Sequence, residues 1–165
     1  MATYQGTTGS TGPSAAEPRP VSILTCTNCG TRNKIRPNPR GAPHCAKCGK
    51  PLPWVVNADE KTFEVEIKAA PTVVVDLWAP WCGPCRIVGP MLEELARQHA
   101  GRLKVVKVNV DENPQLSARF NAMSIPTMIV MRDGQDVDRI VGAMPKPALD
   151  ARLAPYLEKG RPATA

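Results

Sequence analysis

The last two thirds of the chain alternate apolar runs of strand length with longer amphipathic stretches. Thr72–Trp78 is a nearly continuous apolar run rich in β-branched residues, which predicts a buried central strand. Leu103–Asn109 alternates apolar and polar residues, which predicts a second strand. Residues 127–131 and 137–141 predict a hairpin around a Gly-containing turn, and residues 54–56 predict a further short strand.

The amphipathic stretches predict the helices of this region. In residues 84–99, apolar side chains recur at helical spacing along one face. Residues 114–120 and 146–158 predict two more helices. Residues 59–68 predict a helix, although 63–67 also alternate in the manner of a strand. The resulting order βαβαβαββα predicts an α/β fold, with a central mixed sheet covered by helices on both faces.

Composition divides the chain into a basic first third and a neutral remainder. Residues 1–57 carry seven basic residues and one acidic residue, whereas residues 58–165 carry fourteen of each. The net charge of +6 therefore comes from the first third. Residues 1–20 are rich in Gly, Ser, Thr, Ala and Pro, and predict a disordered tail. Residues 161–165 are expected to form a short C-terminal tail.

Residues 21–53 form a unit that a hydrophobic core alone cannot hold together. They contain four cysteines, five prolines and no acidic residue. So few large apolar side chains cannot offset the conformational entropy that is lost on folding. Residues 54–160, by contrast, are expected to form one compact domain from the strands and helices predicted above.

Neither the apolar runs nor the first residues indicate a membrane or secretory protein. No run of 18 apolar residues is present, so no membrane span is expected. The first twenty residues lack a basic stretch followed by an apolar one, so no secretory signal is expected. All six cysteines fall in C-x-x-C pairs, which favours metal and redox chemistry in a reducing cytoplasm over a disulfide framework.

Two of the three C-x-x-C pairs have the spacing of a zinc site. Fifteen residues separate them, which is typical of four-cysteine zinc sites. Gly30 and Gly49 follow the two pairs and allow tight turns that direct backbone N–H groups at sulfur. Four thiolates leave no open position on the metal, so we expect one structural zinc, with His44 a bystander and two disulfides the alternative. The predicted ligands are Cys26, Cys29, Cys45 and Cys48.

The third pair, Cys82 and Cys85, lies where the central strand passes into the first long helix. A helix N-terminus favours a thiolate, and Pro84 suits the first turn because its missing N–H is not needed there. A thiolate attacks a disulfide, and a second thiol nearby releases the mixed disulfide. This pattern favours redox chemistry over the alternative, two additional metal ligands.

Here the sequence resembles a known family. Residues 75–85, VDLWAPWCGPC, resemble the active-site segment of thioredoxins. The motifs KVNVD at 107–111, SIPT at 124–127 and VGA at 141–143 follow in the order and spacing of that family. The resemblance covers about residues 54–160, and the four-cysteine segment makes the chain similar to zinc-containing bacterial thioredoxins, the thioredoxin 2 type. It implies a thioredoxin fold with a small N-terminal zinc-binding unit.

The resemblance implies a protein-disulfide reductase that an NADPH-dependent thioredoxin reductase re-reduces. Its substrates would be disulfide-containing proteins, and its redox group would be the cysteine pair itself, with no bound organic cofactor. No membrane partner is implied, and nothing demands more than a monomer. The Gly-Pro dipeptide between Cys82 and Cys85 resembles the reducing members of the superfamily. Cys82 would be the exposed attacking thiol and Cys85 the buried resolving thiol.

The family also implies roles for residues around the pair. Asp76 would lie beneath it with a pKa raised by burial, and would relay the proton of Cys85. Lys107 would lie near Asp76 and tune it, although an ordinary solvated lysine is the alternative. Pro126 resembles the cis-proline of the family, which would let the Ile125 backbone pair with an extended substrate. The implied docking surface comprises Trp81, Gly83, Pro84, Ile125, Pro126, Gly142 and Ala143.

Two other functions are compatible with the N-terminal unit. Its six basic residues permit nucleic-acid binding, but it offers no Phe, Tyr or Trp on which single-stranded bases could stack. Partners of that class are therefore not expected. Alternatively, an oxidant could release the zinc and thereby change the activity of the attached redox domain.

Overall fold

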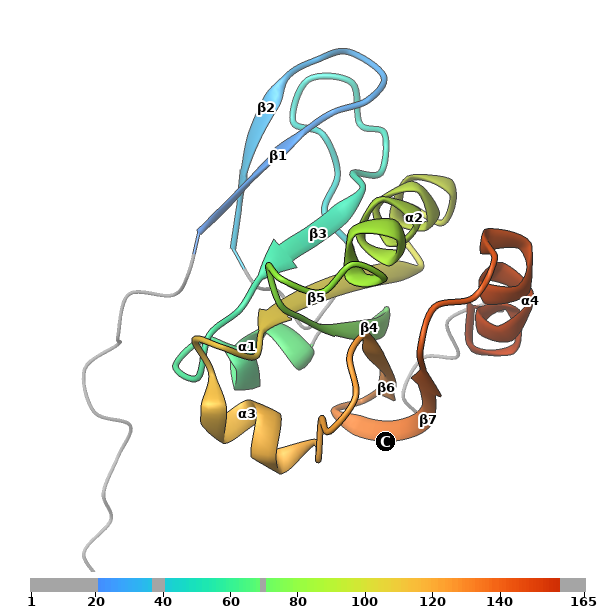
Figure 1. Cartoon of the computed structure of the whole chain (residues 1–165). Helices are drawn as coiled ribbons and strands as arrows, with labels where there is room; N and C mark the ends of the chain where they lie inside the picture. The colour runs from blue at the N-terminus through green and yellow to red at the C-terminus, as the bar shows by residue number, and fades with distance from the viewer. Residues whose placement is uncertain (1–20, 37–40, 69–70, 158–165) are drawn as a thin grey trace, which may run out of the picture.

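The computed structural model describes residues 21–36, 41–68 and 71–157 (Figure 1). The predicted tails 1–20 and 161–165 lie outside these residues. Two sheets are present in the described part. The smaller is an antiparallel pair of β1 (Ser22–Thr25) and β2 (Arg32–Ile35), which the sequence did not predict.

The larger sheet has five strands in the order β3-β5-β4-β6-β7. Strand β4 runs parallel to β5, which runs parallel to β3, while β6 is antiparallel to both β4 and β7. The sheet is therefore mixed, as predicted. Because β4 is central and covered on both faces, all of its residues except Trp78 are buried. The five strands are β3 (Trp54–Asn57), β4 (Thr72–Trp78), β5 (Leu103–Asn109), β6 (Thr127–Arg132) and β7 (Gln135–Val141).

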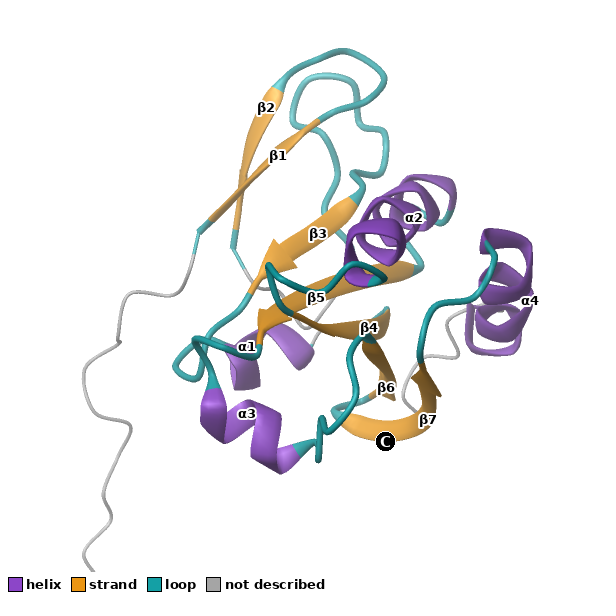
Figure 2. Cartoon of the chain, in the orientation of Figure 1, coloured by secondary structure: helices purple, strands orange, loops and turns teal. Residues whose placement is uncertain are grey.

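Helices cover both faces of this sheet (Figure 2). Apolar side chains of α1 (Phe63–Ile67) and α3 (Pro114–Arg119) pack on one face. Those of α2 (Cys85–Gln98) and α4 (Lys146–Leu157) pack on the other. The predicted α/β class is confirmed. Helix α2 begins at Cys85 with Pro84 as its N-cap, one residue later than predicted.

The strand alternative for residues 63–67 is wrong. Phe63, Glu66 and Ile67 are buried in α1, whereas Glu64 and Val65 are exposed. This spacing of three and four residues is that of one helical face, and it outweighs the alternation of residue types.

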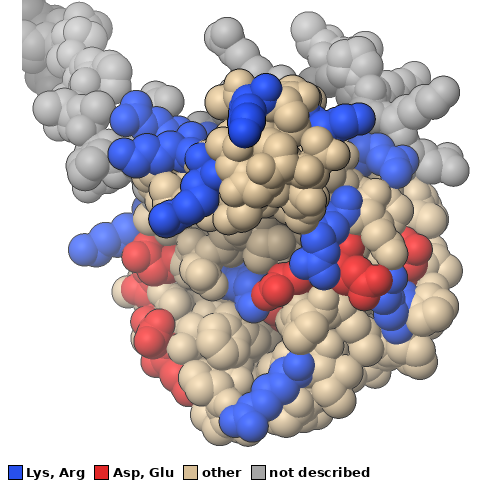
Figure 3. Space-filling model, turned by 90° about the horizontal axis from the view of Figure 1, so that it is seen from above, with Lys and Arg blue, Asp and Glu red and all other residues tan. Residues whose placement is uncertain are grey.

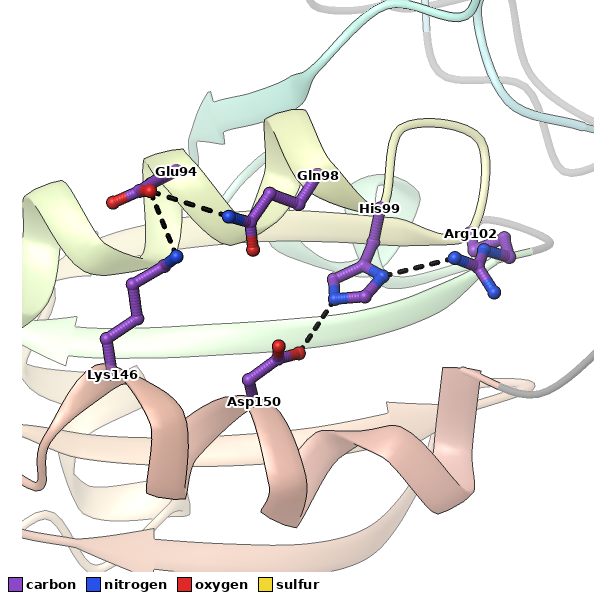
Figure 4. A network of polar contacts seen from close by, with 6 residues as sticks. All are labelled: Glu94, Gln98, His99, Arg102, Lys146 and Asp150. Carbon is purple, nitrogen blue, oxygen red and sulfur yellow. Dashed lines mark hydrogen bonds and ion pairs between the residues drawn. The ribbon is translucent and has the colours of Figure 1, made fainter.

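Helices α2 and α4 are joined by a polar network at their surface (Figure 4). His99 Nε2 lies 2.8 Å from Asp150 Oδ1, and Arg102 Nη2 lies 3.2 Å from His99 Nδ1. Lys146 of α4 pairs with Glu94 of α2 at 2.9 Å. These ion pairs lie near the surface and contribute little to stability, so the docking of the two helices depends on the apolar core beneath them.

The N-terminal unit packs against the same core as α1 and α3. Leu24, Cys26, Cys45 and Leu52 are buried in one cluster with Trp54. The unit therefore contacts the edge of the large sheet at β3 and is continuous with its core. Within the described residues, no helix has the length and apolar character needed to cross a membrane.

Candidate active site and cysteine cluster

The predicted redox pair forms a disulfide at the head of α2. The Sγ atoms of Cys82 and Cys85 are bonded, with 5.3 Å between the two Cα atoms. The central strand β4 ends at Trp78, shortly before the disulfide, and Cys85 is the first residue of α2. The backbone N–H of Cys85 lies 3.2 Å from Cys82 Sγ and donates to it. This N–H has no acceptor within the helix, because it belongs to the first turn, and it is therefore free to stabilise a thiolate at Cys82.

The expectation that Cys82 is exposed is wrong for the disulfide form. Cys82 is 3% exposed and Cys85 is 5% exposed. Both pack with Ala79, and Ile125 lies against this cluster. The two sulfurs are turned toward each other, so neither cysteine presents much surface to solvent. The neighbouring Trp81 is 69% exposed.

Asp76 is a carboxylic acid buried in the centre of the sheet. It is 1% exposed, and its Oδ1 has no hydrogen-bond partner among the described residues. Burial raises the pKa of Asp76 to about 6, the Lys107 ammonium opposes this rise, and the Glu93 carboxylate adds to it. The side chain can therefore change its protonation state near neutral pH.

Lys107 lies beside Asp76 on the neighbouring strand. The two residues are register partners in the parallel pair β4–β5. The Lys107 side chain is 21% exposed, and its Nζ lies 3.3 Å from Glu93 Oε1 and 5.6 Å from the centroid of the Trp78 ring. Lys107 is thus held between charged and aromatic neighbours, unlike a freely solvated surface lysine.

Ile125, Pro126 and Gly142 come together beside the disulfide. The Ile125–Pro126 peptide bond is cis, and the Gly142 N–H donates to the Pro126 carbonyl oxygen at 2.8 Å. Gly142 has φ of 84°, which favours glycine. Ile125 is half-buried and Pro126 is buried. Four of the predicted docking residues are exposed: Trp81, Gly83, Pro84 and Ala143.

The structure adds three residues to this neighbourhood that the sequence did not single out. The Trp81 indole N–H donates to Asp111 Oδ2 at 3.0 Å. Met123 is 87% exposed two residues before Ile125. Glu93 pairs with Lys107. Asp111 ends the KVNVD motif, but neither that motif nor any local pattern around Glu93 predicts these contacts, because each depends on how α2 and the strand ends are placed in space.

The four remaining cysteines form one cluster. Their Sγ atoms all lie within 4.8 Å of one another, with no disulfide between them. The shortest contacts are 3.5 Å for Cys29–Cys45 and 3.6 Å for Cys26–Cys48. The sulfurs of the two C-x-x-C pairs therefore converge on one point, and this set could hold a metal ion.

Both C-x-x-C turns have the same backbone geometry. Gly30 has φ of 71° and Gly49 has φ of 70°, and each N–H donates to the carbonyl of the first cysteine of its pair. The predicted tight glycine turns are thus confirmed.

The surroundings of Cys45 favour its thiolate. The backbone N–H of Cys48 contributes most to lowering the Cys45 pKa to about 6, and Asn33 assists from 3.7 Å. His44 does not join the cluster, because its Nδ1 lies 3.0 Å from the Ala42 carbonyl oxygen.

Known proteins are similar in sequence to the domain that carries the disulfide. A family model described as Thioredoxin matches these residues, which are more than half of the chain. Thioredoxin 1 from Nostoc sp. is 48% identical over 99 residues, covering 59% of this chain and 92% of the relative. Thioredoxin from Alicyclobacillus acidocaldarius is 46% identical over 99 residues, covering 60% and 94%. Thioredoxin from Staphylococcus aureus is 43% identical over 105 residues, covering 64% and 96%.

These matches agree with the geometry of the site. A C-x-x-C disulfide at the head of a helix, with Ile125 of the cis Ile125–Pro126 bond packed against it, is suited to thiol-disulfide exchange. The family model begins at residue 54, after the four-cysteine cluster. The chain belongs to the thioredoxin family and is a thiol-disulfide oxidoreductase that reduces disulfides.

Proposed function

We propose that this chain is a zinc-containing thioredoxin of the thioredoxin 2 type. It reduces disulfides of other proteins in the cytoplasm and is re-reduced by an NADPH-dependent thioredoxin reductase. The observation that carries the proposal is the Cys82–Cys85 disulfide at the start of α2, in a chain that also holds a cluster of four converging thiols. A reducing compartment suits four cysteines that are free and gathered at one point.

The reaction proceeds by two exchanges. The Cys82 thiolate attacks one sulfur of the substrate disulfide, which breaks the substrate S–S bond and releases one substrate thiolate. Cys85, as a thiolate, then attacks the Cys82 sulfur and releases the second substrate thiolate. The substrate has gained two electrons and the chain has lost two in forming Cys82–Cys85. The Cys85 N–H at 3.2 Å from Cys82 Sγ supports Cys82 as the group held as a thiolate.

Asp76 supplies the base for the second exchange. Cys85 must lose its proton before it can attack, and its proton acceptor should have a pKa near the working pH. The buried Asp76 carboxyl, with its pKa of about 6, meets that requirement. Lys107, its register partner, supplies a positive charge that stabilises the carboxylate after the proton has left.

The substrate docks on the apolar surface around the disulfide. An extended substrate segment pairs with the backbone of Ile125, next to the cis peptide bond, in the manner of an added strand. Trp81, 69% exposed, provides the largest apolar contact. Gly83 and Pro84 are exposed beside the sulfurs and leave room for the incoming chain.

Zinc suits the four-cysteine cluster. A tetrahedral zinc with Zn–S bonds of about 2.3 Å needs sulfurs just under 4 Å apart, and the shortest contacts of 3.5 and 3.6 Å are close to that spacing. Four thiolates complete the shell, so the metal is structural. Its ligands are Cys26, Cys29, Cys45 and Cys48.

The test is insulin reduction driven by NADPH and thioredoxin reductase, with zinc content measured on the same samples. We expect turnover in the wild type and none in Cys82→Ser, which retains its zinc. Cys85→Ser should accumulate a mixed disulfide with the substrate, because the resolving thiol is absent. Cys48→Ser serves as the matched control for loss of a thiol outside the redox pair, and it should lose zinc. Absence of turnover in a folded, zinc-loaded wild type would contradict the proposed reductase cycle.

One observation favours a second function, which is nucleic-acid binding by the N-terminal unit. Lys and Arg side chains gather around this unit when the molecule is seen from above (Figure 3). A basic surface binds phosphate with a steep salt dependence. Binding of DNA or RNA that persists at 0.15 M salt and weakens steeply above it would support this function. Binding that is lost at 0.15 M salt would show that the basic side chains form an ordinary solvated surface. The exposed basic residues are Arg32, Lys34, Arg36, Lys47 and Lys50.

A further inference from the structure

The Lys107 ammonium stands between two carboxyl groups and pairs with only one of them. Lys107 and Asp76 are adjacent on parallel strands, which is the closest placement the sheet allows. Among the described residues, the ion pair of Lys107 is nevertheless with Glu93 of α2, at 3.3 Å. Asp76 Oδ1 has no hydrogen-bond partner in residues 21–36, 41–68 and 71–157.

The path of the lysine side chain explains this choice. Lys107 Nζ would lie 3.6 Å from a Cβ added at Gly89, so the side chain reaches α2 where that helix has no side chain. Glu93 follows Gly89 by one helical turn on the same face, where it meets the ammonium. On another side, Lys107 borders an open cleft of about 570 Å³ together with Trp78 and Asn109, so water reaches it.

We propose that Glu93 is a positioning residue of the reductase, which holds the Lys107 ammonium on α2 and away from Asp76. This inference rests on the proposed role of Asp76 as the proton acceptor for Cys85. A direct Lys107–Asp76 ion pair would keep Asp76 as a carboxylate and weaken it as a base. By engaging the ammonium, Glu93 leaves Asp76 able to take up and release a proton near neutral pH.

No other described group around Asp76 could set the protonation of its carboxyl in the same way. Its register partner on β5 is Lys107. Its register partner on β6 is Met128, which carries no charge. Within the part of the chain that the structure describes, Glu93 and Lys107 are the charged side chains that act on Asp76.

The direct test is a pH titration of the Asp76 carboxyl carbon by NMR in the oxidised protein, in which the bonded Cys82 and Cys85 do not titrate. We expect Glu93→Gln to lower the titration midpoint of Asp76 by about one pH unit, because the freed ammonium then moves toward Asp76. Glu94→Gln is the matched control. Glu94 is the next residue on α2 but pairs with Lys146 across the network of Figure 4, so its removal should leave the midpoint unchanged.

The same titration in a Lys107→Met variant separates the effect that Glu93 exerts through Lys107 from the direct effect of the Glu93 charge on Asp76. In Lys107→Met, the midpoint of Asp76 should rise, and the further effect of Glu93→Gln should fall to less than about half. Equal effects of Glu93→Gln with and without Lys107 would overturn the proposal, as would a midpoint in Glu93→Gln equal to that in Glu94→Gln.

The rate of insulin reduction against pH connects this geometry to the reaction. Its acidic limb should move to lower pH in Glu93→Gln by the same amount as the NMR midpoint, and stay in place in Glu94→Gln. Asp76→Asn should abolish that limb. If the limb persists in Asp76→Asn, the proposed role of Asp76 fails, while the NMR titration still decides whether Glu93 positions Lys107.

Discussion

The Lys104 ammonium lies 4.3 Å from the centroid of the Trp54 ring, in the interior of the protein. Lys104 is 0% exposed and Trp54 is 1% exposed. The same ammonium donates to the Glu66 carbonyl oxygen at 2.8 Å and forms an ion pair with the Glu66 carboxylate. Burial lowers the pKa of Lys104, and the bonds to Glu66 oppose that change. The ring and the carboxylate together compensate a charge that water cannot reach.

Removing Glu66 should therefore destabilise the fold strongly. We expect Glu66→Gln to lower the free energy of unfolding by about 3 kcal/mol, because it leaves a buried ammonium without its counter-charge. Urea unfolding at neutral pH measures this. The control is Glu64→Gln on the same helix, whose exposed ion pair with Arg119 should be worth less than about 1 kcal/mol. Equal losses in the two variants would contradict the assignment.

Asp76 should make stability depend on pH. Its pKa is raised from 3.8 to about 6, so between these values the folded chain binds more protons than the unfolded chain. Stability therefore falls as pH rises through this window. We expect Asp76→Asn to be more stable than wild type by about 3 kcal/mol above pH 7, with the difference vanishing below pH 4. Denaturant unfolding of the oxidised protein at both pH values tests this, with the exposed Asp136→Asn as the matched control.

Trp81 should matter for protein substrates and not for the chemistry of the disulfide. We expect Trp81→Ala to raise the KM for insulin about tenfold, because a large exposed ring anchors the docked chain. The rate with a small aromatic disulfide should stay within about twofold, since such a substrate makes few docking contacts. Val65→Ala, which truncates an exposed apolar side chain on α1, is the control. An equal loss with both substrates would show that Trp81 acts on the redox pair itself.

If the four-cysteine cluster holds the proposed zinc, removing that metal should expose Trp54. Residues of the N-terminal unit line the small cavity beside this ring, among them Ile35, Ala42 and Pro43. Without a metal the unit has too small a core to stay folded. We expect a chelator under reducing conditions to shift tryptophan fluorescence to longer wavelength, with the far-UV circular dichroism largely retained. The shift should be absent in Trp54→Phe; metal release without a shift in the wild type would contradict this coupling.

The same signal tests oxidation as a trigger. Thiolates that bind zinc are open to oxidation, which releases the metal. If the cluster is a redox switch, peroxide should release zinc and produce the Trp54 shift. Oxidation of Cys82–Cys85 with unchanged zinc content would exclude the switch.

The strands and helices of residues 54–157 follow from local pattern. β4 and β5 have the predicted bounds, because a run of β-branched residues and an alternating segment leave little choice of conformation. The C-x-x-C motifs identified both cysteine sites, since residue type and spacing are enough to predict metal binding or thiol-disulfide exchange. The N-terminal strands β1 and β2 escaped prediction because their few apolar residues give no period.

The amino-acid sequence by itself determined the α/β class, the redox pair and the four converging thiols, because each depends on residues close together in the chain or on a motif with one chemistry. Only the tertiary structure decided which charges meet. Lys107 pairs with Glu93 and Lys104 with Glu66, although these partners are 14 and 38 residues apart. Such contacts arise from the packing of helices on the sheet, and electrostatic energy depends on distance in space and on burial, neither of which a local pattern contains.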